Sequence, residues 1–209
     1  MRRLLACLAL VCMAVGPAWA GTFPWGGPRP SGEPHPTVVA LRDCTATLRT
    51  NLGEFALRFD PDAAPNAVQA FVKLAERGAL NGARFYCVFK DRMVLAGTPP
   101  SAAKAESSTT IAYESTPQSV TAGSVLLDRT ADGRNCPSRF LIVLADQPHL
   151  DGDYTQIAEV TKGLDVAKRI GSAATRPADG SPAPLEDAVI EQVTVARKAS
   201  PEPKETNKK

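Results

Sequence analysis

The sequence predicts a mostly β fold, in which antiparallel strands form a closed barrel or a sandwich capped by helices. Strand patterns separated by turns account for most of the chain, and only two stretches show the apolar spacing of a helix. A chain of 209 residues is long enough for one substantial core and short for two. A single domain is therefore expected, over residues 37–197.

Both ends of the chain are expected to lie outside this domain. Residues 1–20 combine two arginines, an apolar run too short to span a bilayer and the pattern Ala18-Trp19-Ala20, which together are typical of a cleaved secretory signal peptide. Residues 21–36 are rich in Pro and Gly and predict an extended leader, and residues 198–209 predict a polar, disordered tail. The mature protein is thus expected to be periplasmic or secreted, without membrane insertion after cleavage.

The first elements of the domain are predicted to be strands. A short apolar run, Val38 to Leu41, predicts the first one. Between Thr45 and Phe59, large apolar residues alternate with smaller or charged ones beside the turn Asn51-Leu52-Gly53, which predicts a hairpin.

A helix is predicted next. Pro65 suits a first helical turn, and Gly78 can end the helix in a left-handed conformation. The apolar stripe between them has the spacing i, i+3, i+4, i+7 and consists of Val68, Phe71, Val72 and Ala75.

The rest of the domain is predicted to be mainly strands. A loop rich in Ser, Thr and Ala spans Thr98 to Ser119, and a short helix, Leu164 to Ile170, precedes a Pro-rich loop. The strands are expected at Phe85–Phe89, Met93–Ala96, Ser124–Asp128, Phe140–Leu144, Thr155–Val160 and Ala188–Val195.

Composition excludes several classes of function. Without the two arginines of the signal peptide, the basic and acidic residues are equal in number, which argues against a nucleic-acid partner. The mature chain keeps Cys44, Cys87 and Cys136, whose spacing matches no zinc or CxxC pattern, and the sequence has only two histidines. We therefore expect no metal site and no cofactor, and the pairing of the three cysteines stays open.

Four stretches, taken in order, resemble the cyclophilin-type peptidyl-prolyl isomerases. They are TNLGEFALRFDPDAAPNAVQAFVKLAERG, RFYCVFKDRMVLAG, GSVLLDRTADGRNCPSRFLIVLADQPHLDG and EVTKGLDVAKRI. The similarity covers about residues 45–196 and is closest in pattern to bacterial exported members. It implies a closed eight-stranded antiparallel β-barrel capped by two α-helices, and proline-containing polypeptide segments as partners.

The same resemblance implies a changed catalytic position. Rotation about an X-Pro bond faces a barrier of about 18 to 20 kcal/mol, which a hydrogen bond to the proline nitrogen lowers. The family's arginine donor in Phe-His-Arg-Val corresponds to Cys87 here. A thiol is a weak donor and much shorter than a guanidinium, so Cys87 is not expected to do that work.

Other positions implied by the resemblance have drifted too. The aromatic residue of the proline pocket is replaced by Arg92, and the glutamine of Ser-Gln-Phe-Phe by Arg139. Either arginine is a possible replacement donor, although a solvated arginine at a strand end is the simpler interpretation. The residues expected to bind the peptide are Phe85, Met93, Leu95, Phe140, Leu141, His149, Leu150 and Tyr154.

Three functional hypotheses follow from these residues. The first is a cyclophilin-type isomerase of the cell envelope that assists folding, slow because of Cys87. The second is a non-catalytic chaperone or adaptor that binds proline-containing segments. The third is a scaffold with an acquired surface role, for which the loop from Thr98 to Ser119 is the candidate. The oligomeric state does not follow from the sequence.

Overall fold

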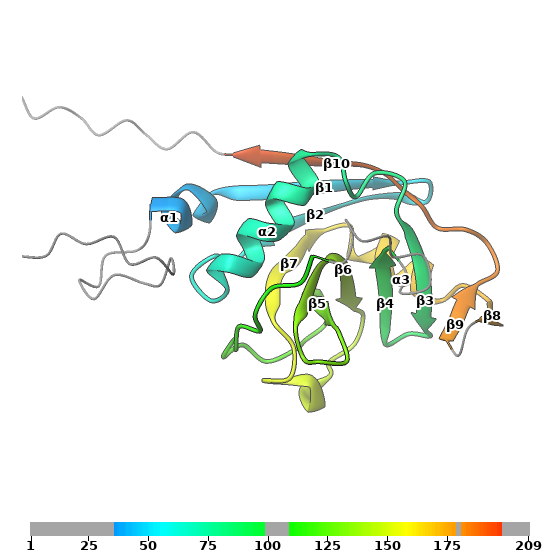
Figure 1. Ribbon diagram of the computed structural model, residues 1–209. Coiled ribbons are helices and arrows are strands. Elements are labelled where there is room, and N and C mark those ends of the chain that lie inside the picture. The colour runs from blue at the N-terminus through cyan, green and yellow to red at the C-terminus, as the bar shows by residue number, and fades with distance from the viewer. Residues whose placement is uncertain (1–35, 99–108, 179–180, 198–209) are drawn as a thin grey trace, which may run out of the picture. The chain divides into compact units, whose positions relative to one another are not determined.

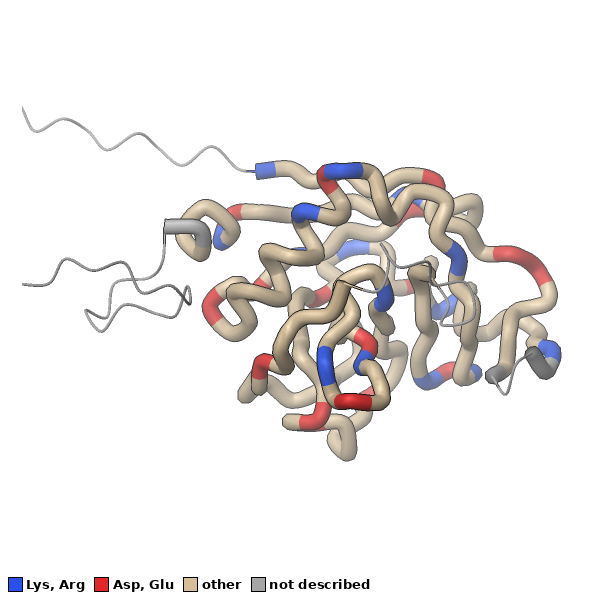
Figure 2. The backbone as a smooth tube through the Cα atoms, viewed as in Figure 1, with Lys and Arg blue, Asp and Glu red and all other residues tan. Residues whose placement is uncertain are grey.

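The computed structural model describes residues 36–98, 109–178 and 181–197. The predicted signal peptide, leader and tail lie outside the described residues, as do residues 99–108 of the long loop. Charges of both signs are interspersed along the described chain (Figure 2).

Eight strands form one antiparallel sheet in the order β10-β1-β2-β7-β5-β6-β4-β3 (Figure 1). Their bounds are β1 Cys44–Thr50, β2 Gly53–Phe59, β3 Arg84–Phe89, β4 Met93–Gly97, β5 Ser124–Arg129, β6 Asn135–Val143, β7 Gln156–Lys162 and β10 Ile190–Arg197. All eight predicted positions beyond the first apolar run are therefore strands, with β6 beginning five residues before Phe140.

Backbone hydrogen bonds join the two outermost strands of this sheet. The amide of Phe85, in β3, donates to the carbonyl of Ala188 at 2.9 Å, and the amide of Ile190, in β10, donates to the carbonyl of Ala83 at 2.8 Å. An isolated bridge between Arg84 and Val189 lies between them. These contacts link the edges, as the predicted barrel requires, and satisfy backbone groups that an open edge would leave unpaired.

The two predicted helices are present. Helix α2, Pro65–Glu76, buries the whole predicted stripe and packs on β10, β6 and β7, and Gly78 follows with a φ of +70°. Helix α3, Leu164–Gly171, packs on β2, β4 and β3. A 3-10 turn, η3, Pro148–Leu150, adds a short element that the sequence did not indicate.

Two sequence predictions were wrong. The run Val38 to Leu41 is part of a helix, α1, Pro36–Arg42, in which Val38 and Leu41 are buried while Val39 is 48% exposed. Two buried residues three positions apart fit one turn of a helix. A run of only four apolar residues is too short to distinguish the 3.6-residue period of a helix from the two-residue period of a strand. The Pro-rich segment before the last strand forms a hairpin, β8 Thr175–Ala178 and β9 Ser181–Pro184, and β9 packs beside β3.

The sheet separates two sets of buried apolar side chains. The main core includes Phe55, Phe71 and Phe140, and the rings of Phe71 and Phe140 meet edge to face with centroids 5.4 Å apart. A second set lies on the other face of β4, β5 and β6, because successive residues of a strand point to opposite faces. This second set contains most of the candidate site.

Candidate peptide-binding site

We call the second apolar set the outer cluster. It consists of Met93, Leu95, Val120, Leu126, Leu141, Val143, Leu150 and Tyr154. The strand residues between its members, such as Val94 and Ile142, belong to the main core. Five of the eight predicted peptide-binding residues therefore come together from β4, β6, η3 and the segment before β7.

A row of directly opposed residues crosses the outer cluster. Leu95 of β4 lies opposite Leu141 of β6, and Leu141 lies opposite Leu126 of β5. On the other side, Leu95 lies opposite Cys87 of β3. Directly opposed residues share a face, so Cys87 stands at the edge of the outer cluster, 1% exposed.

A β-bulge at Tyr86 produces this arrangement. Phe85 lies opposite Ala96 and Cys87 opposite Leu95, so one residue of β3 has no counterpart on β4. Simple alternation would place Phe85 and Cys87 on the same face, whereas the bulge puts Phe85 in the main core and Cys87 on the outer face. The thiol therefore occupies the face of the sheet on which the outer cluster lies.

Arg139 is on the same strand as Leu141, two residues away, and so projects from the same face. Its Nε lies 2.9 Å from Oδ2 of Asp128, and the two side chains are only 10% and 18% exposed. The hydroxyl of Tyr86 is buried near this carboxylate and has no hydrogen-bond partner among the described residues. The solvated-arginine interpretation is thus wrong for Arg139, because the guanidinium is held inside a polar cluster.

Burial dominates the electrostatics of this polar cluster. Removal from water raises the pKa of Asp128 above its ordinary value, and Arg139 offsets only part of that rise. Removal from water also raises the pKa of the Tyr86 hydroxyl, with the nearby Asp128 carboxylate acting in the same direction. Tyr86 is therefore a neutral hydroxyl at physiological pH.

The other candidate donor, Arg92, is exposed in the turn before β4. Its Nη2 donates to Oε1 of Gln147 at 3.0 Å, and the backbone amide of Gln147 in turn donates to the carbonyl of Val120. His149 is exposed at η3 beside Leu150. Both residues therefore border the outer cluster without belonging to it.

The structure does not bring Phe85 and Phe140 into the outer cluster. Both are fully buried in the main core, on the opposite face from Leu95 and Leu141. From there they can support the strands of the site but do not line it. Their predicted role in peptide binding remains a prediction.

Of the three cysteines, Cys44 is a free, buried thiol whose Sγ donates to the carbonyl of Ala40 at 3.4 Å. Burial raises its pKa, which makes it less reactive. Cys87 and Cys136 are buried as well.

Sequence reasoning missed Asp128 and Tyr86. The one signal for Asp128 was a carboxylate inside a predicted buried strand, where acidic residues are rare without a partner. Tyr86 gave no signal, because its position depends on a bulge that the residue pattern does not reveal.

The described residues hold no group of three or more His, Cys, Asp or Glu side chains arranged for a metal ion. Among the same residues, no helix is both long enough and apolar enough to cross a bilayer.

Comparison with known proteins defines first the fold and then the family. A Cryptosporidium parvum cyclophilin type peptidyl-prolyl cis-trans isomerase superposes with a TM-score of 0.64 at 18% identity, over 74% of this chain and 98% of that one. The same protein, solved in the presence of the dipeptide Ala-Pro, superposes equally well. The fold is that of a cyclophilin.

The sequences agree with this fold. The model of the family described as cyclophilin type peptidyl-prolyl cis-trans isomerase/CLD matches residues 45–195. A peptidyl-prolyl cis-trans isomerase of Arabidopsis thaliana is 31% identical over 155 residues, 72% of this chain and 89% of that protein. A probable peptidyl-prolyl cis-trans isomerase of Brucella abortus is 27% identical over 208 residues, 93% of this chain and 98% of its own. The chain belongs to the cyclophilin-type peptidyl-prolyl cis-trans isomerase family.

Proposed function

We propose that this protein is a slow peptidyl-prolyl isomerase of the cell envelope that assists folding by binding proline-containing segments at the outer cluster. The observation that carries the proposal is the apolar row from Cys87 to Leu126, which has a buried guanidinium beside it and reaches solvent at the half-buried members of the outer cluster, Met93, Leu95, Leu150 and Tyr154. A proline ring seated on the half-buried Met93 and Leu95 would leave water, and a hydrogen bond to its amide gains strength there.

The low rate follows from the residue at position 87. If Cys87 replaces a guanidinium that stabilised the transition state, the loss is about 100-fold to 1000-fold. Arg139 can recover part of this, because its side chain lies on the same face and Asp128 keeps it ordered. Its Nε is ion-paired with Asp128 but makes no hydrogen bond among the described residues, so the guanidinium keeps N–H groups that could donate to a proline nitrogen.

A non-catalytic binder is the second candidate. It is favoured by the fact that both candidate guanidiniums already have partners, Arg139 with Asp128 and Arg92 with Gln147. Under that hypothesis the outer cluster retains proline segments without lowering the rotation barrier.

The location in the cell envelope rests on the N-terminal sequence, with its charged, apolar and small-residue regions. N-terminal sequencing of the protein recovered from the periplasm or the medium tests this, and a chain that begins at Gly21 is expected. Recovery of an uncleaved cytoplasmic chain would refute this part of the proposal.

A protease-free isomerase assay tests the activity. We would compare the wild type with Cys87→Arg, Arg139→Ala, Arg92→Ala and the surface control Arg49→Ala. A slow wild-type rate that Arg139→Ala removes and Arg49→Ala leaves unchanged would assign the donor to Arg139. A wild type without activity, together with nuclear magnetic resonance shifts of Leu95 and Leu141 on titration with an Ala-Pro peptide, would favour the non-catalytic binder.

A further inference from the structure

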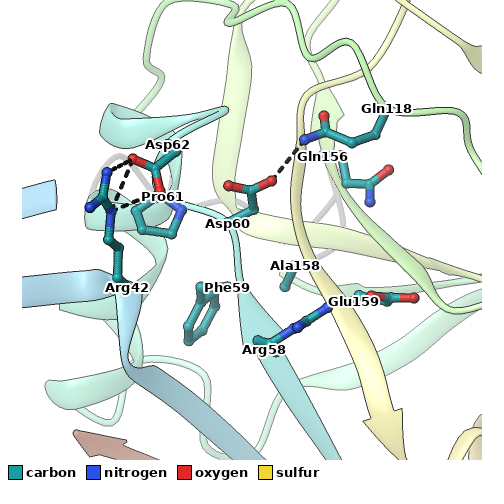
Figure 3. A pocket seen from close by; sticks show the side chains of 10 residues that line it. All are labelled: Arg42, Arg58, Phe59, Asp60, Pro61, Asp62, Gln118, Gln156, Ala158 and Glu159. Carbon is teal, nitrogen blue, oxygen red and sulfur yellow. Dashed lines mark hydrogen bonds and ion pairs between the residues drawn. The ribbon is translucent and has the colours of Figure 1, made fainter. Parts of the chain in front are cut away.

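A second concave site lies outside the outer cluster, between the turn that follows β2 and the start of β7 (Figure 3). Its volume is about 490 Å³. Phe59 and Ala158, which are directly opposed on β2 and β7, form an apolar part of its lining. The volume is sufficient for a long side chain together with a short piece of backbone.

Five charged side chains line this pocket, and four of them form ion pairs. Arg42 donates hydrogen bonds from its Nε and Nη2 to the carboxylate of Asp62, and the shortest contact is 2.6 Å. Arg58 is paired with Glu159 at 3.1 Å. Asp60 is the fifth, and the ion pairs found among the described residues do not include it. The pocket therefore carries one carboxylate in excess.

Asp60 is oriented by neutral donors. Its Oδ2 accepts a hydrogen bond from Nε2 of Gln118 at 2.7 Å, and its Oδ1 accepts one from the backbone amide of Ala63 at 3.2 Å. Figure 3 shows the amide nitrogen of Gln118 directed at Asp60. Because a carboxylate can only accept, this contact determines which end of the Gln118 amide faces it.

That orientation leaves the amide oxygen of Gln118 buried without a hydrogen-bond partner among the described residues. A buried acceptor without a donor is costly, and such groups in native proteins commonly mark a missing ligand or water. The amide oxygen of Gln156, in the same lining, is in the same condition. The pocket thus combines a spare negative charge with two unsatisfied acceptors in its lining, a combination that favours a cation rich in N–H donors.

An anionic ligand does not fit this arrangement. The guanidiniums of Arg42 and Arg58 are already neutralised by carboxylates, and an anion would face Asp60 as well. It would have to break an existing ion pair to bind, whereas a cation completes the charge balance.

The pocket is a neighbour of the outer cluster. Gln156 lies opposite Leu126, the last member of the row that begins at Cys87. The segment that supplies Gln118 to the pocket supplies Val120 to the outer cluster two residues later. Two strand spacings separate Leu141 from Gln156, or about 10 Å, which is about three residues of extended chain.

We propose that this pocket binds an arginine or lysine side chain of the same polypeptide whose proline occupies the outer cluster, at a separation of three residues or more. The claim that a proline occupies the outer cluster rests on the proposed function. The claim that a basic side chain occupies the pocket rests on the pocket alone. The protein would accordingly select proline segments that carry a nearby positive charge.

Fluorescence anisotropy with labelled peptides tests this selection. Each peptide carries one proline, with arginine placed three, four or five residues before or after it, and a matched peptide carries glutamine in place of the arginine. We expect the best arginine peptide to bind about tenfold more tightly than its glutamine match, as one charge-assisted hydrogen bond provides.

Asp60→Asn is the decisive variant. The new amide can keep the bond from Ala63 and donate to Gln118 once that amide turns over, so folding should survive. We expect the preference for arginine to disappear while the glutamine peptide binds as before. Asp43→Asn, which removes an exposed charge outside the pocket, is the matched control and should keep the preference.

Equal binding of arginine and glutamine peptides to the wild type would overturn the inference, as would a preference that survives Asp60→Asn. If the inference is overturned but the glutamine peptides still bind, the proposed function remains intact. Replacing proline by alanine in the peptides tests the reverse case, in which the pocket binds arginine but the outer cluster does not bind proline. If the arginine preference persists without any dependence on proline, the pocket stands and the proposed function fails.

Discussion

The Nε of Arg139 lies 2.9 Å from the carboxylate of Asp128, and the two residues come from adjacent strands, with side chains largely out of water. The Asp128 carboxylate also accepts a hydrogen bond from the backbone amide of Arg129 at 2.9 Å. A buried ion pair of this kind adds little stability compared with apolar residues of equal volume. Removal of one partner, however, destabilises the fold, because it leaves an uncompensated buried charge. Because the pair lies next to the outer cluster, the same contact contributes to the stability of the fold and holds the candidate donor Arg139 beside the proposed peptide site.

Asp128→Ala should therefore destabilise the fold by about 3 kcal/mol, because Arg139 stays buried without its counter-ion. Urea unfolding measures the loss. Glu159→Ala breaks the exposed pair with Arg58 and is the matched control, with an expected cost below about 1 kcal/mol. Equal losses in the two variants would contradict the buried position of the first pair.

The raised pKa of Asp128 predicts how stability depends on pH. The folded state holds the Asp128 proton more tightly than the unfolded chain, whose aspartates titrate near pH 4. This contribution to the free energy of unfolding falls as pH rises from about 4 through the raised pKa. The free energy of unfolding of the wild type, minus that of Asp128→Asn, should therefore decrease over that pH range. A difference that stays constant or increases would refute the raised pKa of Asp128.

The carboxylate of Glu114 stabilises the start of helix α2 from a distant loop. It accepts hydrogen bonds from the backbone amides of Asn66 and Ala67, at 3.2 and 2.7 Å, where Ala64 offers no side-chain cap. Glu114→Ala should cost about 1 kcal/mol, the value of an N-terminal cap, while Glu114→Gln should cost less. Thermal unfolding measures both, with the exposed Glu186→Ala as control. A Glu114→Ala protein as stable as that control would show that the capping bonds contribute nothing.

Gly97 permits β4 to approach β6 closely. Its φ is +119°, and an added Cβ would lie 2.0 Å from the carbonyl oxygen of Ser138. Gly97→Ala should cost about 3 kcal/mol or more, since backbone would have to move on two strands. Gly82→Ala introduces a side chain at a φ of +78° with nothing within 4 Å, and should cost about 1 kcal/mol. Similar unfolding midpoints for the two variants would argue against the close approach.

Leu141 and Leu127 provide a matched pair on opposite faces of the sheet. Both are buried, Leu141 in the outer cluster and Leu127 in the main core. Each change to alanine should cost about 2 to 5 kcal/mol in stability. Only Leu141→Ala should weaken binding of an Ala-Pro peptide below the unfolding temperature, and calorimetric titration of both variants decides this. Equal weakening would place the peptide elsewhere.

Much of the fold could be predicted from local patterns. The alternation between Thr45 and Phe59 indicates a strand with one buried face, and the stripe of α2 indicates a helix with one buried face. Such a pattern predicts the secondary structure whatever the rest of the fold is, because it depends only on which face is buried. The resemblance to the family added the eight-stranded antiparallel barrel with its two helices. The short run at Val38 was misread because four apolar residues fit a helix turn as well as a strand.

The residue types of the candidate site could be predicted in the same way. Met93, Leu95, Leu141, Leu150 and Tyr154 were expected from the resemblance, and they do gather in the outer cluster. The sequence by itself also established that position 87 carries a thiol, and therefore that any strong donor has to come from another residue.

Tertiary structure alone decided which side chains meet. The bulge at Tyr86 turns Cys87 toward the outer cluster and Phe85 toward the main core, and strand register brings Asp128 to Arg139 and Gln156 to Leu126. The two pairs, Asp128 with Arg139 and Gln156 with Leu126, are 11 and 30 positions apart in the chain, and both depend on shifts of a single residue in register. A one-residue shift reverses the face of every following side chain, and local residue patterns carry no record of it.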